Sequence, residues 1–265
     1  MTLVVNEMHL LDGLSKTLVV AAADRRISLD GEYADSRRKV LGIPYLHGAV
    51  SYFGLAKVYP PGREQWLDDW LSVFINSHSA VTDLGAFACE LGRELGRVIP
   101  QSVLKRNASG FHICGYNQRG LPDFWYLSNI GCMDQFVYRD LSQRYDVPAS
   151  HFLGRDAPAN FGWDGVDPST ARDGHQTYRN GDIRGHEALW DALGRGLTAL
   201  FHLDDFQGPG DPRQYGEYVK FKFEVIAYVY RKWAKKKIID KPIDVLVAHN
   251  LNGSPESFWV ARRRS

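Results

Sequence analysis

The sequence has little of what defines several common protein classes. Its three cysteines, Cys89, Cys114 and Cys132, are an odd number without short spacings between them. They argue against a disulfide framework and against a thiolate zinc site, and they favour three buried thiols in a reducing compartment. The sequence contains no apolar run of about 18 residues, so we expect no membrane-spanning helix.

An excess of charge of one sign is also missing. The chain has 32 Lys and Arg residues against 31 Asp and Glu residues, which gives a net charge of +1 at pH 7. This balance creates no field over the whole protein that would attract nucleic acid or an acidic membrane. We therefore expect no nucleic acid and no membrane among its partners.

Several motifs of catalysis and ligand binding are absent as well. The chain contains no G-x-x-x-x-G-K-[ST], no G-x-S-x-G, no H-E-x-x-H, and no G-x-G-x-x-G after a predicted strand. The nine histidines are scattered and do not have the spacing of metal ligands. We expect no metal site and no cofactor.

What is present is the composition of a folded protein. The 265 residues are 44% hydrophobic and 24% charged, which is enough to bury a full core and excludes a disordered chain, a collagen and a coiled coil. At about 150 residues per domain, one large domain or two small ones both fit. The first residues carry no basic segment, and Asn6, Glu7 and His9 interrupt their apolar run. We therefore expect no secretory signal and a cytoplasmic protein.

Hydrophobic patterns predict the order of strands and helices. Two apolar runs, residues 2–11 and 17–23, flank the turn signal Asp12-Gly13 and predict a hairpin. The second run is apolar on both faces, which indicates a sheet covered on both sides. Further strands are expected at 39–43, 49–53, 111–116, 124–127, 242–249 and 257–261, and helices at 63–75, 83–99, 186–202 and 218–237.

This order predicts an α+β fold. Runs of strands alternate with pairs of helices, which favours two mostly antiparallel sheets covered by helices. We expect a four-layer αββα sandwich, with two sheets between two helix layers, in a single domain that spans residues 1–265. Residues 146–182 contain three prolines and little periodicity, and we expect them to form a long surface insertion.

Four residues in the first quarter of the chain fit one catalytic mechanism. Removal of Met1 would leave Thr2 with a free α-amine beside its hydroxyl, and an α-amine with a pKa near about 8 is a competent base for that hydroxyl. Asp24 ends the second strand and Lys39 opens the next, so a lysine ammonium could favour the deprotonated hydroxyl while the carboxylate holds it. Gly54 ends the following strand and could offer a backbone N–H to an oxyanion. The alternative is a turn-capping Asp24 and a chain that merely begins Met-Thr.

The segments that carry these residues resemble the proteasome β-subunit superfamily of N-terminal nucleophile (Ntn) hydrolases, in its bacterial proteasome-like branch. TLVVNEMHL is similar to the first strand of that family, with Thr2 at the nucleophile, and TLVVAAADRRIS to the second, with Asp24 at the family Asp. KVLGI matches the strand opened by the family Lys, here Lys39, and SYFG ends at the oxyanion glycine, here Gly54. FHICGYNQRGLPDFWYL resembles the central strand pair, and KPIDVLVAHNLNG the closing strand.

The resemblance implies an Ntn-hydrolase fold and a threonine-type peptidase or amidohydrolase. Its substrate would be a peptide or a small amide, cleaved through an acyl-enzyme on Thr2. No propeptide precedes Thr2 in the sequence, so we expect maturation to need only the loss of Met1. The family also implies self-assembly into a homo-oligomeric ring or open spiral, with an unfoldase partner that the sequence does not identify.

The chain departs from the family pattern in several places. Its first hairpin is longer, and Asn180-Gly181-Asp182 falls at the loop where the family has a catalytic Ser. Asp240 lies near the position of the later family Asp, and residues 146–182 have no counterpart. These departures favour a second hypothesis, a catalytically inactive proteasome-like scaffold or binding subunit. Aromatic residues on the predicted helices also favour it, namely Trp66, Trp70 and Trp233.

Overall fold

The two apolar runs at the start of the chain form the predicted hairpin inside a sheet. The computed structural model describes residues 3–29, 32–135, 137–146 and 149–260, without the side chains at 29, 155–156 and 183–185. β1 (Leu3–Asp12) pairs antiparallel with β2 (Lys16–Asp24). Because side chains alternate along a strand, Val4 and Met8 enter one core cluster while Leu3 and Val5 enter another. Both faces of the hairpin are therefore covered, as its sequence predicts.

The described strands form two five-stranded sheets and two short ribbons. The first sheet has the order β12-β1-β2-β13-β14, where β12 is Gly174–Gly181, β13 is Ile243–Asn250 and β14 is Glu256–Trp259. The second has the order β11-β10-β9-β6-β5, with β11 at Val137–Asp146, β10 at Pro122–Asp134, β9 at Gly110–Tyr116, β6 at Gly48–Phe53 and β5 at Val40–Ile43. The ribbons pair β3 (Arg26–Leu29) with β4 (Glu32–Ser36), and β7 (Lys57–Val58) with β8 (Gln65–Trp66). Neighbouring strands run antiparallel in both sheets.

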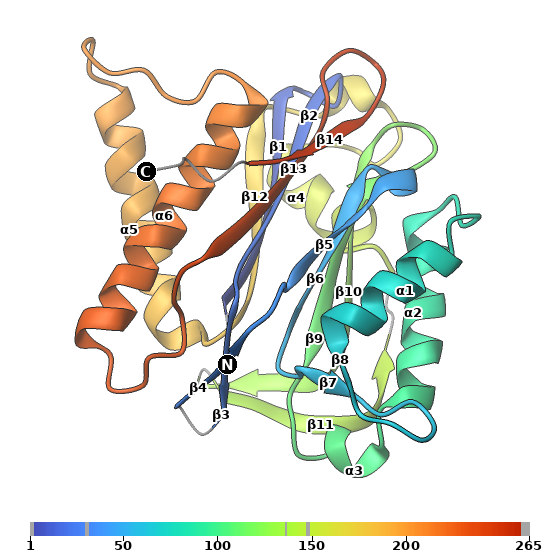
Figure 1. Cartoon of the computed structure of the whole chain (residues 1–265). Coiled ribbons are helices and arrows are strands. Elements are labelled where there is room, and N and C mark those ends of the chain that lie inside the picture. Colours follow the sequence, from blue (N-terminus) through green and yellow to red (C-terminus); the bar gives the residue numbers. More distant parts are fainter. Residues whose placement is uncertain (1–2, 30–31, 136, 147–148, 261–265) are drawn as a thin grey trace.

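Helix pairs cover the outer faces of the two sheets (Figure 1). α1 (Leu67–Ser77) and α2 (Leu84–Val98) pack on the second sheet, and α5 (Ile183–Phe201) and α6 (Pro212–Trp233) pack on the first. A third cluster fills the space between the sheets, with contributions from β1, β2, β9 and β13. The molecule is thus a mixed α+β protein with layers in the order helix, sheet, sheet, helix. The short helices α3 (Gln101–Leu104) and α4 (Ala157–Phe161) complete it.

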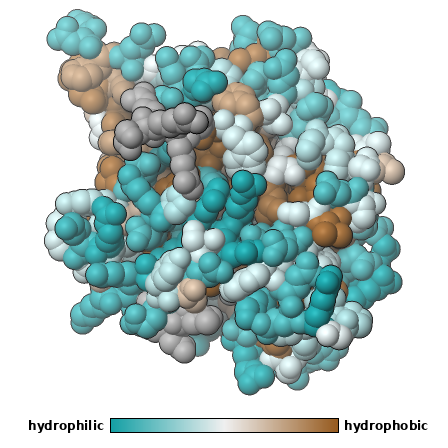
Figure 2. Space-filling view, viewed as in Figure 1, coloured by the Kyte–Doolittle hydropathy of each residue, from teal (hydrophilic) through white to brown (hydrophobic). Residues whose placement is uncertain are grey.

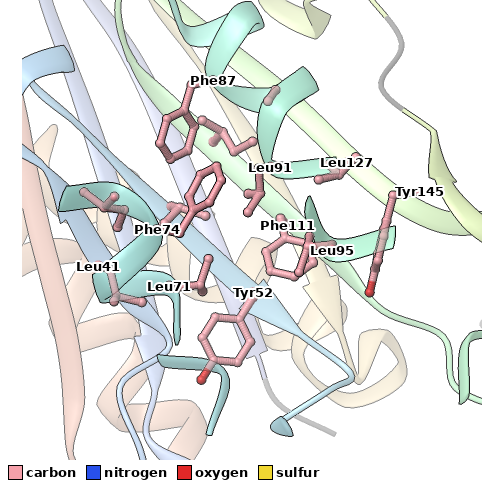
Figure 3. Close-up of a cluster of buried hydrophobic side chains, with 14 of the residues drawn as sticks. Leu41, Tyr52, Leu71, Phe74, Phe87, Leu91, Leu95, Phe111, Leu127 and Tyr145 are labelled. Atoms are coloured by element: carbon pink, nitrogen blue, oxygen red, sulfur yellow. The ribbon is translucent and has the colours of Figure 1, made fainter. Parts of the chain in front are cut away.

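The core under α1 and α2 also holds a segment of the candidate site. Figure 3 shows Leu71 of α1 and Phe87 of α2 packing toward the second sheet, where Tyr52 of β6 lies. The Tyr52 hydroxyl donates to the Arg38 carbonyl at 2.8 Å, and its backbone N–H donates to the Lys39 carbonyl at 3.1 Å. Packing of this cluster therefore fixes the backbone that carries Lys39.

Two helix predictions show how capping sets the ends. The helix predicted at 83–99 is confirmed as α2, and its first turn is capped by Asp83, which accepts a hydrogen bond from Ala86 N at 2.8 Å. The helix predicted at 218–237 instead begins at Pro212, after the cap Asp211, and ends at Trp233. Proline fits the first turn of a helix. The proline and glycine residues before residue 218 are typical of a loop, so the sequence pattern does not predict the earlier start of the helix.

Residues 149–182 differ from the surface insertion that their composition predicts. Phe152, Phe161 and Trp163 are at most 2% exposed and lie in the core between the sheets. The segment then continues into β12, which pairs with β1 over eight residue pairs from Leu3 to Leu10. Large aromatic side chains bury enough apolar area to anchor a chain without helical or strand periodicity. Residues 149–163 therefore contribute to the core, and the prediction of a surface segment is wrong for them. Most of residues 164–175 are exposed, as the prediction expects.

The prediction of three buried thiols is also wrong. Cys114 is buried between the sheets, whereas Cys89 and Cys132 are exposed. Cys89 lies on the outer side of α2, and Cys132 lies near the end of β10 that extends past its pairing with β9. Composition alone does not show which face of an element a cysteine occupies.

Candidate active site

The start of β1 is fixed by a carboxylate from β2. The backbone N–H of Leu3 donates to Asp24 Oδ1 at 3.0 Å, and the N–H of Arg26 donates to Asp24 Oδ2 at 3.0 Å. Asp24 has no exposed surface. The predicted nucleophile, Thr2, precedes Leu3 and lies outside the described residues. The structure therefore gives the surroundings of the first strand without the nucleophile itself.

The structure brings Asp24 and Lys39 together. Lys39 Nζ lies 3.2 Å from Asp24 Oδ2 and donates to the Arg26 carbonyl at 2.5 Å. Lys39 is 2% exposed, so this is a buried ion pair. Burial lowers the pKa of Lys39 from its ordinary value, and the Asp24 carboxylate opposes that shift. Lys39 therefore places a positive charge close to the first residue of β1. Because its pKa is lowered, it releases its proton more readily than an ordinary lysine.

Lys39 lines a cavity of about 440 Å³ that opens beside the ion pair. Most of the wall is apolar or aromatic, and it includes Ile27, Tyr52, Phe53, Tyr59, Trp66 and Val103. A volume in the range of about 300–1,000 Å³ accommodates a small ligand or a large side chain. The cavity therefore places a space that suits an apolar group next to the buried ion pair.

Gly54 lines the same cavity from the end of β6. Its φ of +91° lies in the region that favours glycine, and an added Cβ would lie 2.0 Å from the Ala108 carbonyl oxygen. No other residue fits here without moving the backbone. The structure thus places Lys39 and Gly54 on one cavity, with Asp24 behind the lysine.

The Asn180-Gly181-Asp182 segment lies beside the first residue of β1. Gly181 is the strand partner of Leu3, and Asp182 is the N-cap residue of α5. Tyr230 of α6 donates to Asp182 Oδ2 at 3.3 Å. The segment therefore lies at the predicted end of the sheet, with an asparagine and an aspartate where the family resemblance would place a serine loop.

Asp240, the other predicted late residue, reaches the site indirectly. Its Oδ2 lies 3.7 Å from Arg26 Nη1, and the Arg26 carbonyl in turn accepts the hydrogen bond from Lys39. Asp240 therefore supports Arg26, and among the described contacts it does not pair with Lys39.

A polar network that the sequence does not predict lies between the sheets. His112 of β9 is fully buried, with Nδ1 2.7 Å from Asn6 Oδ1 and Nε2 2.5 Å from Asn180 Oδ1. Tyr138 of β11 completes the network, because its hydroxyl accepts the Gly181 N–H at 3.0 Å and donates to the Gly181 carbonyl at 3.2 Å. Burial lowers the pKa of His112 to about 4, so its imidazole is neutral at pH 7. The one signal in the sequence is Asn6, a polar residue within an apolar strand.

Neither a metal-binding cluster nor a membrane-spanning helix is found among the described residues. Within them, no group of three or more His, Cys, Asp or Glu side chains is arranged to hold a metal ion. None of the helices in the described part of the chain is long and apolar enough to cross a membrane.

Comparison with known proteins adds no assignment. No protein-family model matches the chain, and no curated protein matches it.

Proposed function

We propose that the chain is an N-terminal threonine amidohydrolase with an Ntn-hydrolase fold, acting after Met1 is removed. The observation that carries the proposal is the buried Asp24–Lys39 pair, whose carboxylate also holds the Leu3 N–H at the start of β1. A nucleophile on the residue before Leu3 would stand next to a fixed positive charge. The four-layer arrangement of helices and sheets supports the same proposal.

In this mechanism the Thr2 Oγ attacks the carbonyl carbon of an amide. Its own α-amine takes the hydroxyl proton, directly or through a water molecule, and returns it to the leaving nitrogen when the C–N bond breaks. The Lys39 ammonium favours the developing alkoxide, and Asp24 orients that ammonium. The Gly54 N–H is the proposed donor to the oxyanion. Water then hydrolyses the ester and frees the threonine.

The proposed substrate is a peptide or a small amide with an apolar group next to the scissile bond. The aromatic walls of the cavity beside Lys39 support this class, because they would remove such a group from water. Such an enzyme is expected to work in the cytoplasm.

The first test is the intact mass of the purified protein, before and after treatment with a β-lactone or epoxyketone probe. The proposal expects loss of Met1 and one adduct per chain, which Thr2→Ala abolishes and Thr2→Ser retains. Lys39→Met is expected to abolish the adduct in protein that still folds. Retention of Met1, or an adduct that survives in Thr2→Ala, would contradict the mechanism.

A second candidate is a non-catalytic, proteasome-like subunit that assembles into a ring or spiral. It is favoured by Asn180 at the expected serine loop and by exposed aromatic residues on α6, namely Phe221, Tyr228 and Trp233. Trp66 and Trp70 support it less, because both are partly buried against neighbouring residues. On the face seen in Figure 2, hydrophobic residues form separate patches among hydrophilic ones. Light scattering of the purified chain and of Trp233→Ser tests this candidate, since a monomer at all concentrations excludes it.

A further inference from the structure

A second cavity lies on the face of the first sheet that α5 and α6 cover. It has a volume of about 930 Å³ and lies between β1 and β12 on one side and α5 and α6 on the other. Glu7 and His9 line it, following Leu3 and Val5 on the same face of β1. At about 3.3 Å per residue, His9 lies roughly 20 Å along the strand from Leu3. This cavity is therefore distinct from the candidate active site.

The floor of this cavity is a buried group of charges. The Glu7 carboxylate, 1% exposed, accepts hydrogen bonds from Lys222 Nζ at 3.0 Å and from Trp190 Nε1 at 3.1 Å, both at Oε1. Its Oε2 lies 3.0 Å from His9 Nε2. Burial raises the pKa of Glu7, but the bonds from His9 and Lys222 outweigh burial and the net pKa is lowered. Glu7 is therefore ionised at pH 7.

The fold does not need charges at this place. Leu18 and Val20 of β2 occupy the same face of the sheet, and they pack under the helices as ordinary apolar residues. Replacing a buried ion pair by well-packed apolar residues is often neutral or stabilising. Charged and titratable groups that face a cavity are more typical of a binding site than of a structural core.

The bond to Glu7 fixes the orientation of His9. Because an ionised carboxylate only accepts hydrogen bonds, the proton of the neutral imidazole lies on Nε2, which leaves Nδ1 for a ligand. The His9 ring stacks with His175 of β12 at 5.5 Å and lies 4.9 Å from Tyr215 of α6.

The other charges favour an anionic ligand. Asp191 already accepts hydrogen bonds from Arg179 at 2.7 and 3.3 Å, and Asp173 accepts the Gly13 N–H at 2.8 Å. Arg195, on the α5 wall, has no carboxylate within ion-pair distance in the part of the chain that the structure describes. The uncommitted groups are therefore mostly hydrogen-bond donors.

Aromatic rings form the rest of the cavity wall. Lys222 Nζ lies 4.1 Å from the centre of the Trp190 ring and 4.9 Å from that of Tyr218, and Phe201 lines the cavity from the end of α5. Burial raises the pKa of Tyr218 to about 12, so this phenol stays neutral. A flat ring can stack on such walls, while an acidic group reaches the donors.

We propose that this cavity binds a small aromatic carboxylate, with its carboxylate toward Arg195 and its ring among the aromatic walls. Among the acidic groups that line the cavity, Glu7 pairs with Lys222 and Asp191 with Arg179, while Asp173 accepts the Gly13 N–H. Burial lowers the pKa of His175, so that ring does not supply the positive charge. Arg195 is therefore the cation that meets the ligand carboxylate.

Calorimetric titration with benzoate, phenylacetate and indole-3-acetate at neutral pH tests the proposal. Phenylacetamide is the matched neutral control, and acetate is the control without a ring. At least one aromatic carboxylate is expected to bind about tenfold more tightly than either control, since a charge-assisted hydrogen bond is lost with the amide.

Two arginine variants test whether the ligand binds in this cavity. Arg195→Gln changes an exposed side chain and is expected to weaken binding about tenfold, whereas Arg93→Gln, on the exposed side of α2, leaves it unchanged. Thr2→Ala is expected to bind normally, so failure of the proposed hydrolase would not affect this result. The proposal is overturned if no aromatic carboxylate binds at millimolar concentration, if the amide binds equally well, if the two arginine variants behave alike, or if Thr2→Ala loses binding.

Discussion

The ammonium of Lys39 lies 3.2 Å from Asp24 Oδ2, and neither side chain has more than a trace of exposed surface. The two residues are fifteen positions apart, on either side of the β3–β4 ribbon. The same carboxylate accepts the Leu3 N–H. One ion pair therefore connects the start of β1, the end of β2 and the backbone before β5, and its loss should affect both stability and the site.

The double replacement of this pair should cost less stability than the two single replacements added together. Lys39→Met leaves the Asp24 charge buried without its partner, and Asp24→Asn does the same to Lys39, so each should lower the free energy of unfolding by about 3–5 kcal/mol. Asp24→Asn/Lys39→Met removes both charges and should cost less than the sum by about 1 kcal/mol or more. Urea denaturation of the four proteins measures this coupling. Additive losses would show that the two charges do not interact.

The double variant also separates stability from chemistry. It should fold, yet it should not react with a threonine-directed probe, because the charge that favours the alkoxide is gone. If the folded double variant were labelled as fast as the parent protein, Lys39 would have a purely structural role.

Gly54→Ala should be strongly destabilising. The new Cβ would lie 2.0 Å from the Ala108 carbonyl oxygen and 2.7 Å from Ser109 Cα, at a φ of +91°. Strain of the backbone and displacement of β9 should together cost about 3 kcal/mol or more. Thermal and urea unfolding measure the loss.

Gly62→Ala is the matched control for the backbone conformation. Gly62 has a φ of +82°, but an added Cβ would meet nothing within 4 Å. It should lose only the cost of a positive φ, about 1 kcal/mol. Equal losses in the two variants would show that contact with Ala108 is unimportant.

The three thiols should react in a fixed order. Cys114 is buried, accepts a hydrogen bond from Asn6 Nδ2 at 3.1 Å, and has its pKa raised to about 12 by burial. Cys89 and Cys132 are exposed, and a hydrogen bond to Asp140 raises the pKa of Cys132. Because the thiolate is the reactive form, an aromatic disulfide reagent should label Cys89 first, Cys132 more slowly and Cys114 only after unfolding. Three fast thiols in the folded protein would contradict the buried position of Cys114.

The parts of the fold that sequence predicts well are those specified by neighbouring residues. The alternation in β2 places Leu18 and Val20 on one face and Val19 and Ala21 on the other, so a doubly covered strand is readable from the chain. The cap at Asp83 is similarly local. Contact between Asp24 and Lys39 was also predicted, because each residue ends or begins a strand of the same region, although their catalytic role stays a prediction.

The rest depends on residues that are far apart in the chain. Glu7 and Lys222 are 215 positions apart, and His112 lies 106 positions from Asn6. No local sequence pattern therefore predicts either contact. β12 has a polar sequence with a weak preference for strand structure. It forms a strand because its backbone pairs with the edge of β1. These are tertiary effects that override local propensity.

Acid should destabilise the protein through His112. Burial lowers its pKa to about 4, whereas an unfolded histidine titrates near about 6.5. Between these values the unfolded chain binds a proton that the folded chain does not, so stability is retained above about pH 6.5 and falls as the pH is lowered toward about 4. At 1.36 kcal/mol for each pH unit, the loss from this residue reaches about 3 kcal/mol.

Replacing His112 with Gln should therefore flatten the dependence of stability on pH in that range. Urea unfolding at several pH values, for the parent, His112→Gln and His47→Gln, isolates the effect, since His47 is an exposed residue in a turn. Glutamine can keep a polar contact with Asn6, so the variant should lose stability at neutral pH but lose less on acidification. His47→Gln should follow the parent at every pH. Parallel curves for the parent and His112→Gln would mean that the folded protein accepts a proton on His112 as readily as the unfolded chain does, and the buried network between the sheets would not hold that imidazole neutral.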